Sequence, residues 1–200
     1  GVVTGVRGSV LAPDASPRGV ASNRIVEGEF EYGGQAVVVT SGGIGGNHDL
    51  VRANWPQRLG EAPADMLTGV PAYVDGRMLA ITEAAGGAVV NRDRMWHYVE
   101  GVRNWDPVWP GHAIRILAGP SAMWFDGRGN RLPAPYFPGF DTLGTLDHLQ
   151  HTGVEHSWFI LNRALAGKEF ALSGSEQNLD LTQRRYRDVL KRPITAVQPS

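Results

Sequence analysis

The chain has 200 residues, of which 42% are hydrophobic and 20% charged, a composition that excludes a disordered or fibrous protein. Its 19 basic and 20 acidic side chains leave a formal net charge of −1, which gives no electrostatic basis for binding nucleic acid or an anionic membrane surface. The absence of cysteine excludes disulfide bonds and cysteine-ligated metals and fits a cytoplasmic protein, and we find no apolar run long enough to span a membrane.

The first 50 residues have the pattern of β-structure. Residues 2–11 and 24–32 alternate polar and apolar side chains, while residues 12–23 between them are rich in proline and serine, as loops are. Residues 36–40 form a short apolar run with three consecutive valines, which is typical of a strand buried on both faces in a parallel sheet. The pattern therefore predicts a β-meander followed by a parallel strand.

Helical patterns follow this β-rich part. Residues 49–55 can form a short helix. The clearest helix starts at Asp75, which has the position of an N-cap, and stops at Gly86, where a C-terminal glycine belongs. Two more helices are predicted over residues 143–151 and 182–191.

Short strands are predicted in the second half of the chain. Residues 113–117 and 123–126 have strand-like patterns, and residues 127–130 form a hairpin-type turn. Residues 158–161 have the composition of a buried strand. Together with the helices, these elements predict an α+β (mixed α/β) chain.

A glycine-rich turn is the strongest local signal for function. The strand at residues 36–40 runs into T-S-G-G-I-G-G at residues 40–46, and a helix follows. Glycines let a backbone come within hydrogen-bonding distance of a bulky ligand, and amides at the following helix start favour phosphate. The G-x-G-x-x-G fingerprint occurs nowhere in the chain, so this is not the first turn of a Rossmann unit. The turn is either part of a nucleotide site or a tight turn needed only for packing.

Four segments, taken in chain order, carry a family pattern. A glycine-punctuated meander leads to A-V-V-V-T-S-G-G at residues 36–43, Y-V-D-G at residues 73–76 precedes a helix that ends in A-A-G-G, and M-W-F-D-G-R-G-N-R-L and S-W-F-I-L-N occupy residues 123–132 and 157–162. Together they resemble FAD-binding dehydrogenases of the fumarate reductase and succinate dehydrogenase flavoprotein superfamily, in its 3-ketosteroid dehydrogenase-like branch. The resemblance spans residues 2 to about 190.

This resemblance implies a domain organisation and a cofactor. Residues 1–50 would be the end of the first segment of a split FAD-binding domain, and residues 51–200 an incomplete substrate-capping domain. The expected function is that of a fragment of an FAD-dependent oxidoreductase that acts on C–C bonds of a hydrophobic, steroid-like or cyclic ketone substrate. The remainder of the flavoprotein chain is then a partner, and we expect the 200 residues alone to bind FAD weakly or not at all and to be inactive.

The resemblance also implies cofactor contacts. By position, Thr40, Ser41, Gly42 and Gly43 would lie against the FAD, and Asp75 would also reach it. Because Asp75 stands at the start of a predicted helix, a role as its N-cap is the alternative.

The candidate catalytic residues are His97, Tyr98 and Glu100. They fall where dicarboxylate-using relatives carry their H-P-T substrate motif, and Glu100 takes the place of the histidine. Because an acid there would repel a dicarboxylate, fumarate and succinate are not the expected substrates. The alternative is that Tyr98 is a core aromatic residue and His97 a polar residue with its hydrogen bonds satisfied.

A rival function comes from another class of protein. The chain could be a non-catalytic α+β module that binds a ligand or a partner through its tryptophan-rich region, residues 96–124. His148, His151 and His156 have a spacing that a metal site could use, but no carboxylate cluster completes the set and we expect no metal.

Overall fold

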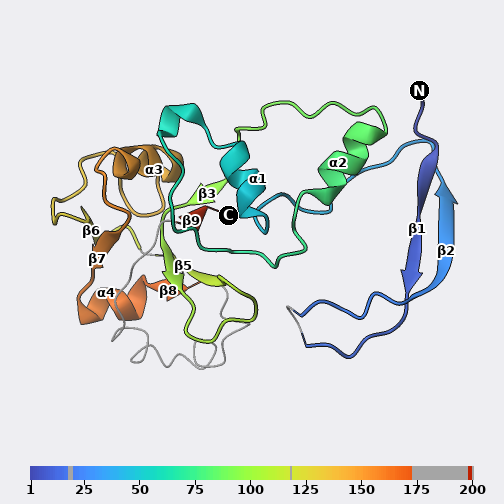
Figure 1. The fold of residues 1–200 in the computed structure, drawn as a ribbon. Helices are drawn as coiled ribbons and strands as arrows, with labels where there is room; N and C mark the ends of the chain where they lie inside the picture. Colours follow the sequence, from blue (N-terminus) through green and yellow to red (C-terminus); the bar gives the residue numbers. More distant parts are fainter. Residues whose placement is uncertain (18–19, 118, 173–197, 200) are drawn as a thin grey trace.

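The chain folds into short strands and helices joined by long loops (Figure 1). This computed structural model describes residues 1–17, 20–117, 119–172 and 198–199. Its elements in chain order are β1 (Gly5–Leu11), β2 (Val26–Gly33), α1 (His48–Ala53), the 3-10 helix η1 (Gln57–Leu59), α2 (Arg77–Ala84), β3 (His97–Tyr98), β4 (Gly101–Arg103), β5 (Ala113–Leu117), β6 (Met123–Asp126), α3 (Thr142–Gln150), β7 (Ser157–Ile160), α4 (Arg163–Lys168), β8 (Ala171–Leu172) and β9 (Gln198–Pro199). Within these ranges, no helix has the length and apolar character needed to cross a membrane.

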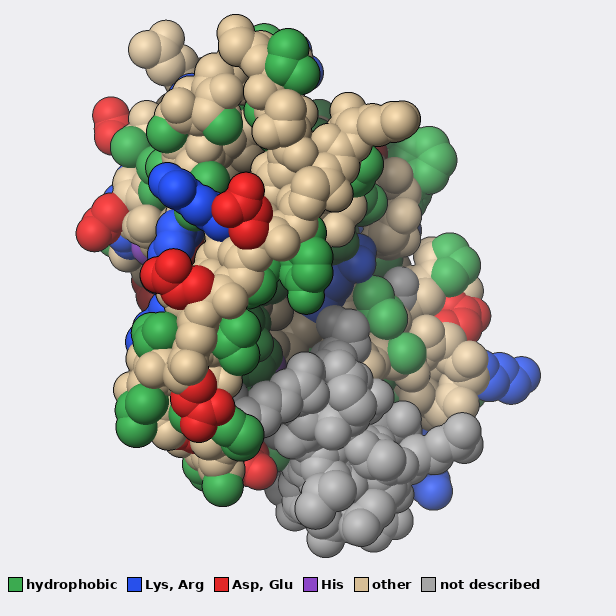
Figure 2. All heavy atoms as spheres, turned by 90° about the vertical axis from the view of Figure 1, so that its right-hand side faces the viewer, with side chains coloured by type: hydrophobic (Ala, Val, Ile, Leu, Met, Phe, Trp, Pro, Cys, Tyr) green, Lys and Arg blue, Asp and Glu red, His purple; other side chains and the backbone are tan. Residues whose placement is uncertain are grey.

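The β-rich start of the chain is an antiparallel ribbon. β1 pairs with β2 from Gly5 opposite Gly33 to Leu11 opposite Val26, as the alternating pattern predicts. Figure 1 shows this ribbon standing off from the rest of the molecule, and most of its side chains are exposed. Figure 2, which looks onto the side that carries the ribbon, shows exposed hydrophobic side chains among acidic and basic ones. A two-stranded ribbon of this kind has little stability of its own without a surface to pack on.

The prediction of a strand over residues 36–40 is wrong. These residues form no strand, and Val38 and Val39 are 82% and 44% exposed. A parallel strand is stabilised by hydrogen bonds to neighbours and by burial of both faces. Among the described strands none pairs with residues 36–40, so the valines alone do not make one.

Three small antiparallel sheets form the rest of the fold. β4, β5 and β8 make one sheet in that order, β6 pairs with β7, and β3 pairs with β9. Two hydrophobic clusters form the core, the first of them including residues of α3, and Phe159 packs against both. The first cluster contains Leu59, Val99, Trp124, Leu132, Leu146 and Leu149, and the second contains Val102, Ile114, Ile116, Phe170 and Leu172.

Three of the predicted helices are present as α1, α2 and α3, and side chains cap two of them. Asn47 caps α1, since its side chain accepts a hydrogen bond from the Leu50 amide at 3.0 Å. α2 also forms, but its N-cap is Gly76 and not Asp75. In α3 the Asp141 side chain accepts from the Gly144 amide at 2.8 Å. The helix predicted over residues 182–191 lies outside the described residues.

The predicted strands of the second half are confirmed, with one correction. β5 and β6 have the expected bounds, and the turn after β6 is held by Asp126, whose carboxylate accepts hydrogen bonds from two backbone amides of that turn. The strand near residue 158 forms as β7, but it is not buried, since Trp158 is 40% and Ile160 is 48% exposed. β7 has β6 as its neighbour in a two-stranded sheet, and the outer face of that sheet carries these side chains.

Candidate functional site

The glycine-rich turn and the segment before α2 lie side by side. The Gly46 amide donates to the Val74 carbonyl at 2.8 Å, and the Gly76 amide donates to the Gly43 carbonyl at 3.1 Å. The Asn47 side chain adds a bond to the Asp75 carbonyl at 3.4 Å. We call these two segments, residues 40–46 and 74–76, the glycine platform. The structure thus places Gly42 and Gly43 against the segment that contains Asp75, and Thr40 and Ser41 directly precede these glycines in the chain.

Packing explains some glycines of the platform but not all. A Cβ on Gly46 would lie 2.5 Å from the Pro71 carbonyl oxygen. Gly76 has φ +81°, and a Cβ there would lie 2.7 Å from a methyl group of Leu50. A Cβ on Gly43, in contrast, would meet nothing within 4 Å. The fold therefore needs glycine at positions 46 and 76, whereas position 43 leaves space for something else to approach the backbone.

The exposed side of the platform consists of the predicted cofactor residues. Thr40, Ser41, Gly42 and Gly43 are all exposed. They offer backbone groups and two hydroxyl groups to the surface, which is the donor set that a polar part of a nucleotide cofactor requires.

Asp75 has a local role in starting α2. Its two carboxylate oxygens accept hydrogen bonds from the Arg77 amide at 3.0 Å and from the Arg77 guanidinium at 2.8 Å. The hydrogen bond from the Arg77 amide is the main cause that lowers the pKa of Asp75. The carboxylate thus stays ionised and supports the first turn of the helix from just before the N-cap.

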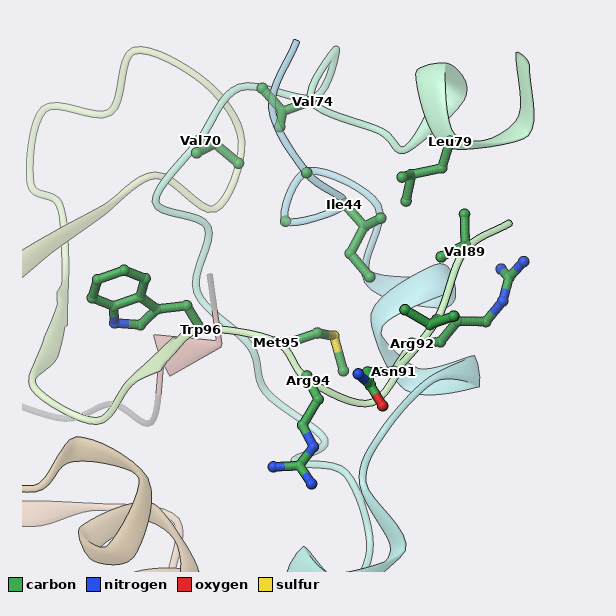
Figure 3. A pocket seen from close by; sticks show the side chains of 13 residues that line it. Ile44, Val70, Val74, Leu79, Val89, Asn91, Arg92, Arg94, Met95 and Trp96 are labelled. Atoms are coloured by element: carbon green, nitrogen blue, oxygen red, sulfur yellow. The ribbon is translucent and has the colours of Figure 1, made fainter. Parts of the chain in front are cut away.

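A cavity of about 410 Å³ adjoins the platform (Figure 3). Gly43, Ile44 and Gly45 form one side of it, and residues 89–96 form another. Apolar side chains dominate its lining, including those of Ile44, Val70, Val74, Leu79, Val89 and Met95. Three polar side chains, those of Asn91, Arg92 and Arg94, complete it. This cavity could not be predicted from the sequence, because residues 89–96 have neither helical nor strand periodicity.

The three candidate catalytic residues do not form one group. Around β3 successive side chains point to opposite sides, as in any extended chain. His97 is 1% exposed and stacks on Trp55, with ring centroids 4.9 Å apart. Burial lowers the pKa of His97 from its ordinary 6.5 to about 4, and the charge of Arg58 acts in the same direction. His97 is therefore neutral near pH 7 and faces the interior.

Tyr98 and Glu100 meet instead at Arg115, a residue of β5 that the sequence did not single out. The Arg115 guanidinium carbon lies 3.7 Å from the centroid of the Tyr98 ring, a cation–π contact. Its Nε lies 3.6 Å from Glu100 Oε2, an ion pair that is too long for a hydrogen bond. Burial raises the pKa of Glu100, and the charge of Arg115 opposes that shift. Alternation of side chains in β5 predicts which residues share a face of the sheet, but not this pairing.

The other candidate residues have local partners. His148 stacks on Tyr136, His151 lies against Asp147, and His156 packs edge-on against Trp158. In the ranges that the structure covers, no three histidine or acidic side chains come together as a metal would require. In the tryptophan-rich region, Trp109 and Trp124 are 5% and 3% exposed and belong to the core, whereas Trp96 is 72% exposed and lines the cavity.

Comparison with known proteins gives consistent matches. Residues 3–198 match the FAD binding domain family. A KsdD-like steroid dehydrogenase of Mycolicibacterium smegmatis is 61% identical over 192 residues, which are 96% of this chain and 35% of that protein. A KsdD-like steroid dehydrogenase of Mycobacterium tuberculosis is 57% identical over 197 residues, 98% of this chain and 35% of that protein. The chain thus spans about a third of the length of the curated relatives it matches. No solved structure is significantly similar to it.

Proposed function

Because this chain belongs to the family of FAD-binding domains, which it matches over residues 3–198, we propose that it is part of an FAD-dependent dehydrogenase. The family confirms the resemblance seen in the sequence and FAD as the cofactor. A flavin supplies the redox step itself, so the protein has to hold cofactor and substrate and to provide an acid or a base. In this proposal residues 1–50 end a first FAD-binding segment and residues 51–200 belong to the capping domain.

The glycine platform is the proposed cofactor contact. Its exposed residues, Thr40 to Gly43, offer amides and hydroxyl groups, and Asp75 lies beside them. The observation that carries the proposal is the open space at Gly43, where the fold itself has no need of a glycine. A backbone without a side chain at this point lets a bulky planar ligand come within hydrogen-bonding distance.

The proposed substrate is hydrophobic, a steroid or another cyclic ketone, and the reaction is at its C–C bonds. Two observations support this class. The cavity beside the platform is mostly apolar, and the similar proteins from Mycolicibacterium smegmatis and Mycobacterium tuberculosis are named as KsdD-like steroid dehydrogenases. Of the three candidate catalytic residues, Tyr98 is half-buried whereas His97 and Glu100 are buried. We therefore assign proton transfer to Tyr98 and the positioning of its ring to Arg115 and Glu100.

The proposal is tested by adding one methyl group to the platform. In the flavoprotein that contains this segment, Gly43→Ala should lower the affinity for FAD by about tenfold, because the methyl group holds the cofactor away from the backbone. Since nothing lies within 4 Å of that methyl group, urea unfolding should be unchanged. FAD affinity is measured by fluorescence titration of the apoprotein.

Gly167→Ala is the matched control. A Cβ on Gly167 also meets nothing within 4 Å, but Gly167 is exposed in α4, outside the platform and outside residues 1–50. This variant should bind FAD as the unchanged protein does. FAD affinity that is equal in Gly43→Ala and Gly167→Ala would show that the platform does not contact the cofactor.

A further inference from the structure

The cavity beside the platform has two arginines in its lining, and they differ in how their charge is balanced. Arg92 forms an ion pair with Glu83 of α2. For the Arg94 side chain, no hydrogen bond or ion pair is found within the described ranges, although its backbone amide donates to the Asn91 carbonyl at 2.8 Å. The two side chains leave the segment in different directions (Figure 3). Among the described residues, the cavity lining therefore has one arginine side chain that is paired with an acid and one, Arg94, that is not.

An available guanidinium next to an apolar cavity selects for a particular ligand chemistry. The apolar part of a ligand gains from burial against Ile44, Leu79 and Met95. A carboxylate or another anionic oxygen gains charge-assisted hydrogen bonds from an arginine, which presents several N–H donors in a planar fork. The bond from Arg94 to Asn91 fixes the backbone from which this side chain extends.

We propose that this cavity binds a ligand with an apolar ring body and one acidic group, and that Arg94 is the residue that recognises the acid. This inference rests on the proposed function, since it specifies the substrate of the site beside the cofactor platform. It separates two classes that the proposed function treats alike, neutral cyclic ketones and cyclic compounds with an anionic group. Arg94 is then a residue that determines specificity, while the apolar lining supplies the affinity that both classes share.

A pair of fluorescent probes tests the proposal on the apoprotein of the flavoprotein that contains this segment. 8-Anilinonaphthalene-1-sulfonate has an apolar ring system and one sulfonate, and N-phenyl-1-naphthylamine has the same rings without the sulfonate. In Arg94→Gln the dissociation constant of the anionic probe should rise about tenfold, the usual loss for one charge-assisted contact, while that of the neutral probe stays the same. Arg94→Lys, which keeps the charge, should recover most of the anionic probe's affinity. Arg163→Gln, an exposed arginine in α4, is the matched control and should change neither constant.

A second variant locates the probes. Val89→Phe fills part of the cavity and should weaken both probes, whereas unchanged binding of both would place them elsewhere and overturn the proposal. Equal losses for both probes in Arg94→Gln, or no loss for either, would overturn it as well.

Measurements of FAD binding distinguish a failure of this inference from a failure of the proposed function. If FAD displaces the anionic probe, and Arg94→Gln weakens FAD as much as the probe, the arginine binds a cofactor phosphate. That result would overturn the inference about the substrate and leave the proposed function in place. Failure of the proposed function would show instead as unchanged FAD affinity in Gly43→Ala.

Discussion

His97 combines a titratable ring with an apolar environment. It is 1% exposed, it stacks on Trp55, and neither of its ring nitrogens has a hydrogen-bond partner among the described residues. A neutral imidazole in such a place already loses its hydrogen bonds to water, and a protonated one costs far more because its charge loses hydration without gaining a partner. The burial that lowers its pKa to about 4 is therefore also a source of pH-dependent stability.

We predict that the free energy of unfolding falls as the pH drops from 6.5 toward 4. In this range the unfolded chain binds a proton at His97 and the folded chain does not, so protons favour unfolding. The contribution of His97 is complete above pH 6.5 and is lost progressively below it, by a total of about 3 kcal/mol at pH 4. Urea unfolding at intervals between pH 7 and pH 4 measures this change.

Two variants separate His97 from the other titrating groups. His97→Leu should remove this part of the pH dependence, while His151→Leu, which changes an exposed histidine, should keep it. The same slope of stability with pH in His97→Leu and in the unchanged chain would contradict the prediction.

Arg115 links two of the candidate catalytic residues, Tyr98 and Glu100. It contacts the Tyr98 ring and the Glu100 carboxylate at once, and Glu100 is 4% exposed. A buried carboxylate without a cation is costly, so the pair limits where the Tyr98 ring can lie. In our proposal, Glu100 therefore acts on Tyr98 through Arg115 and not on a ligand.

At the scale of elements, the platform depends on the close approach of two loops. The Gly46 amide donates to the Val74 carbonyl, and a Cβ on Gly46 would lie 2.9 Å from that same oxygen. We predict that Gly46→Ala lowers the free energy of unfolding by about 2 kcal/mol, because the neighbouring atoms belong to the backbone and cannot rotate away. Urea unfolding should show this loss in Gly46→Ala and none in Gly43→Ala. Equal stability of the two variants would mean that the loops are not packed as described.

The elements that the sequence predicted correctly are those specified by local chemistry. Asn47 and Asp141 cap their helices, and the β1–β2 ribbon follows its alternating pattern. The run at residues 36–40 failed because a buried strand depends on neighbours that local sequence does not supply. The same holds for the site: the resemblance indicated residues 40–43 and 75, but the cavity and the contacts of Arg115 arise from segments that are distant in sequence.

At the scale of the whole molecule, much apolar surface is exposed on the N-terminal part. Val2, Val26, Tyr32 and Val38 are 87%, 56%, 67% and 82% exposed. Single exposed apolar residues are common, but the ribbon gathers Val6, Phe30 and Tyr32 on one face, while its other face carries charged side chains such as Arg7 and Glu31. In the proposed flavoprotein, the remainder of the polypeptide would cover the apolar face. The chain spans 35% of the length of its curated relatives, which is consistent with that proposal.

We therefore predict that the 200 residues alone bind FAD weakly or not at all and have no dehydrogenase activity. The platform supplies one set of cofactor contacts, and a dinucleotide of this size is normally held by several segments at once. Flavin fluorescence titration and the absorbance of the purified chain test this, with the longer flavoprotein as the positive control. A yellow chain that keeps stoichiometric FAD through gel filtration would show that the platform and the adjoining cavity suffice to hold the cofactor. The exposed apolar face of the ribbon would then need an explanation other than contact with the rest of a flavoprotein.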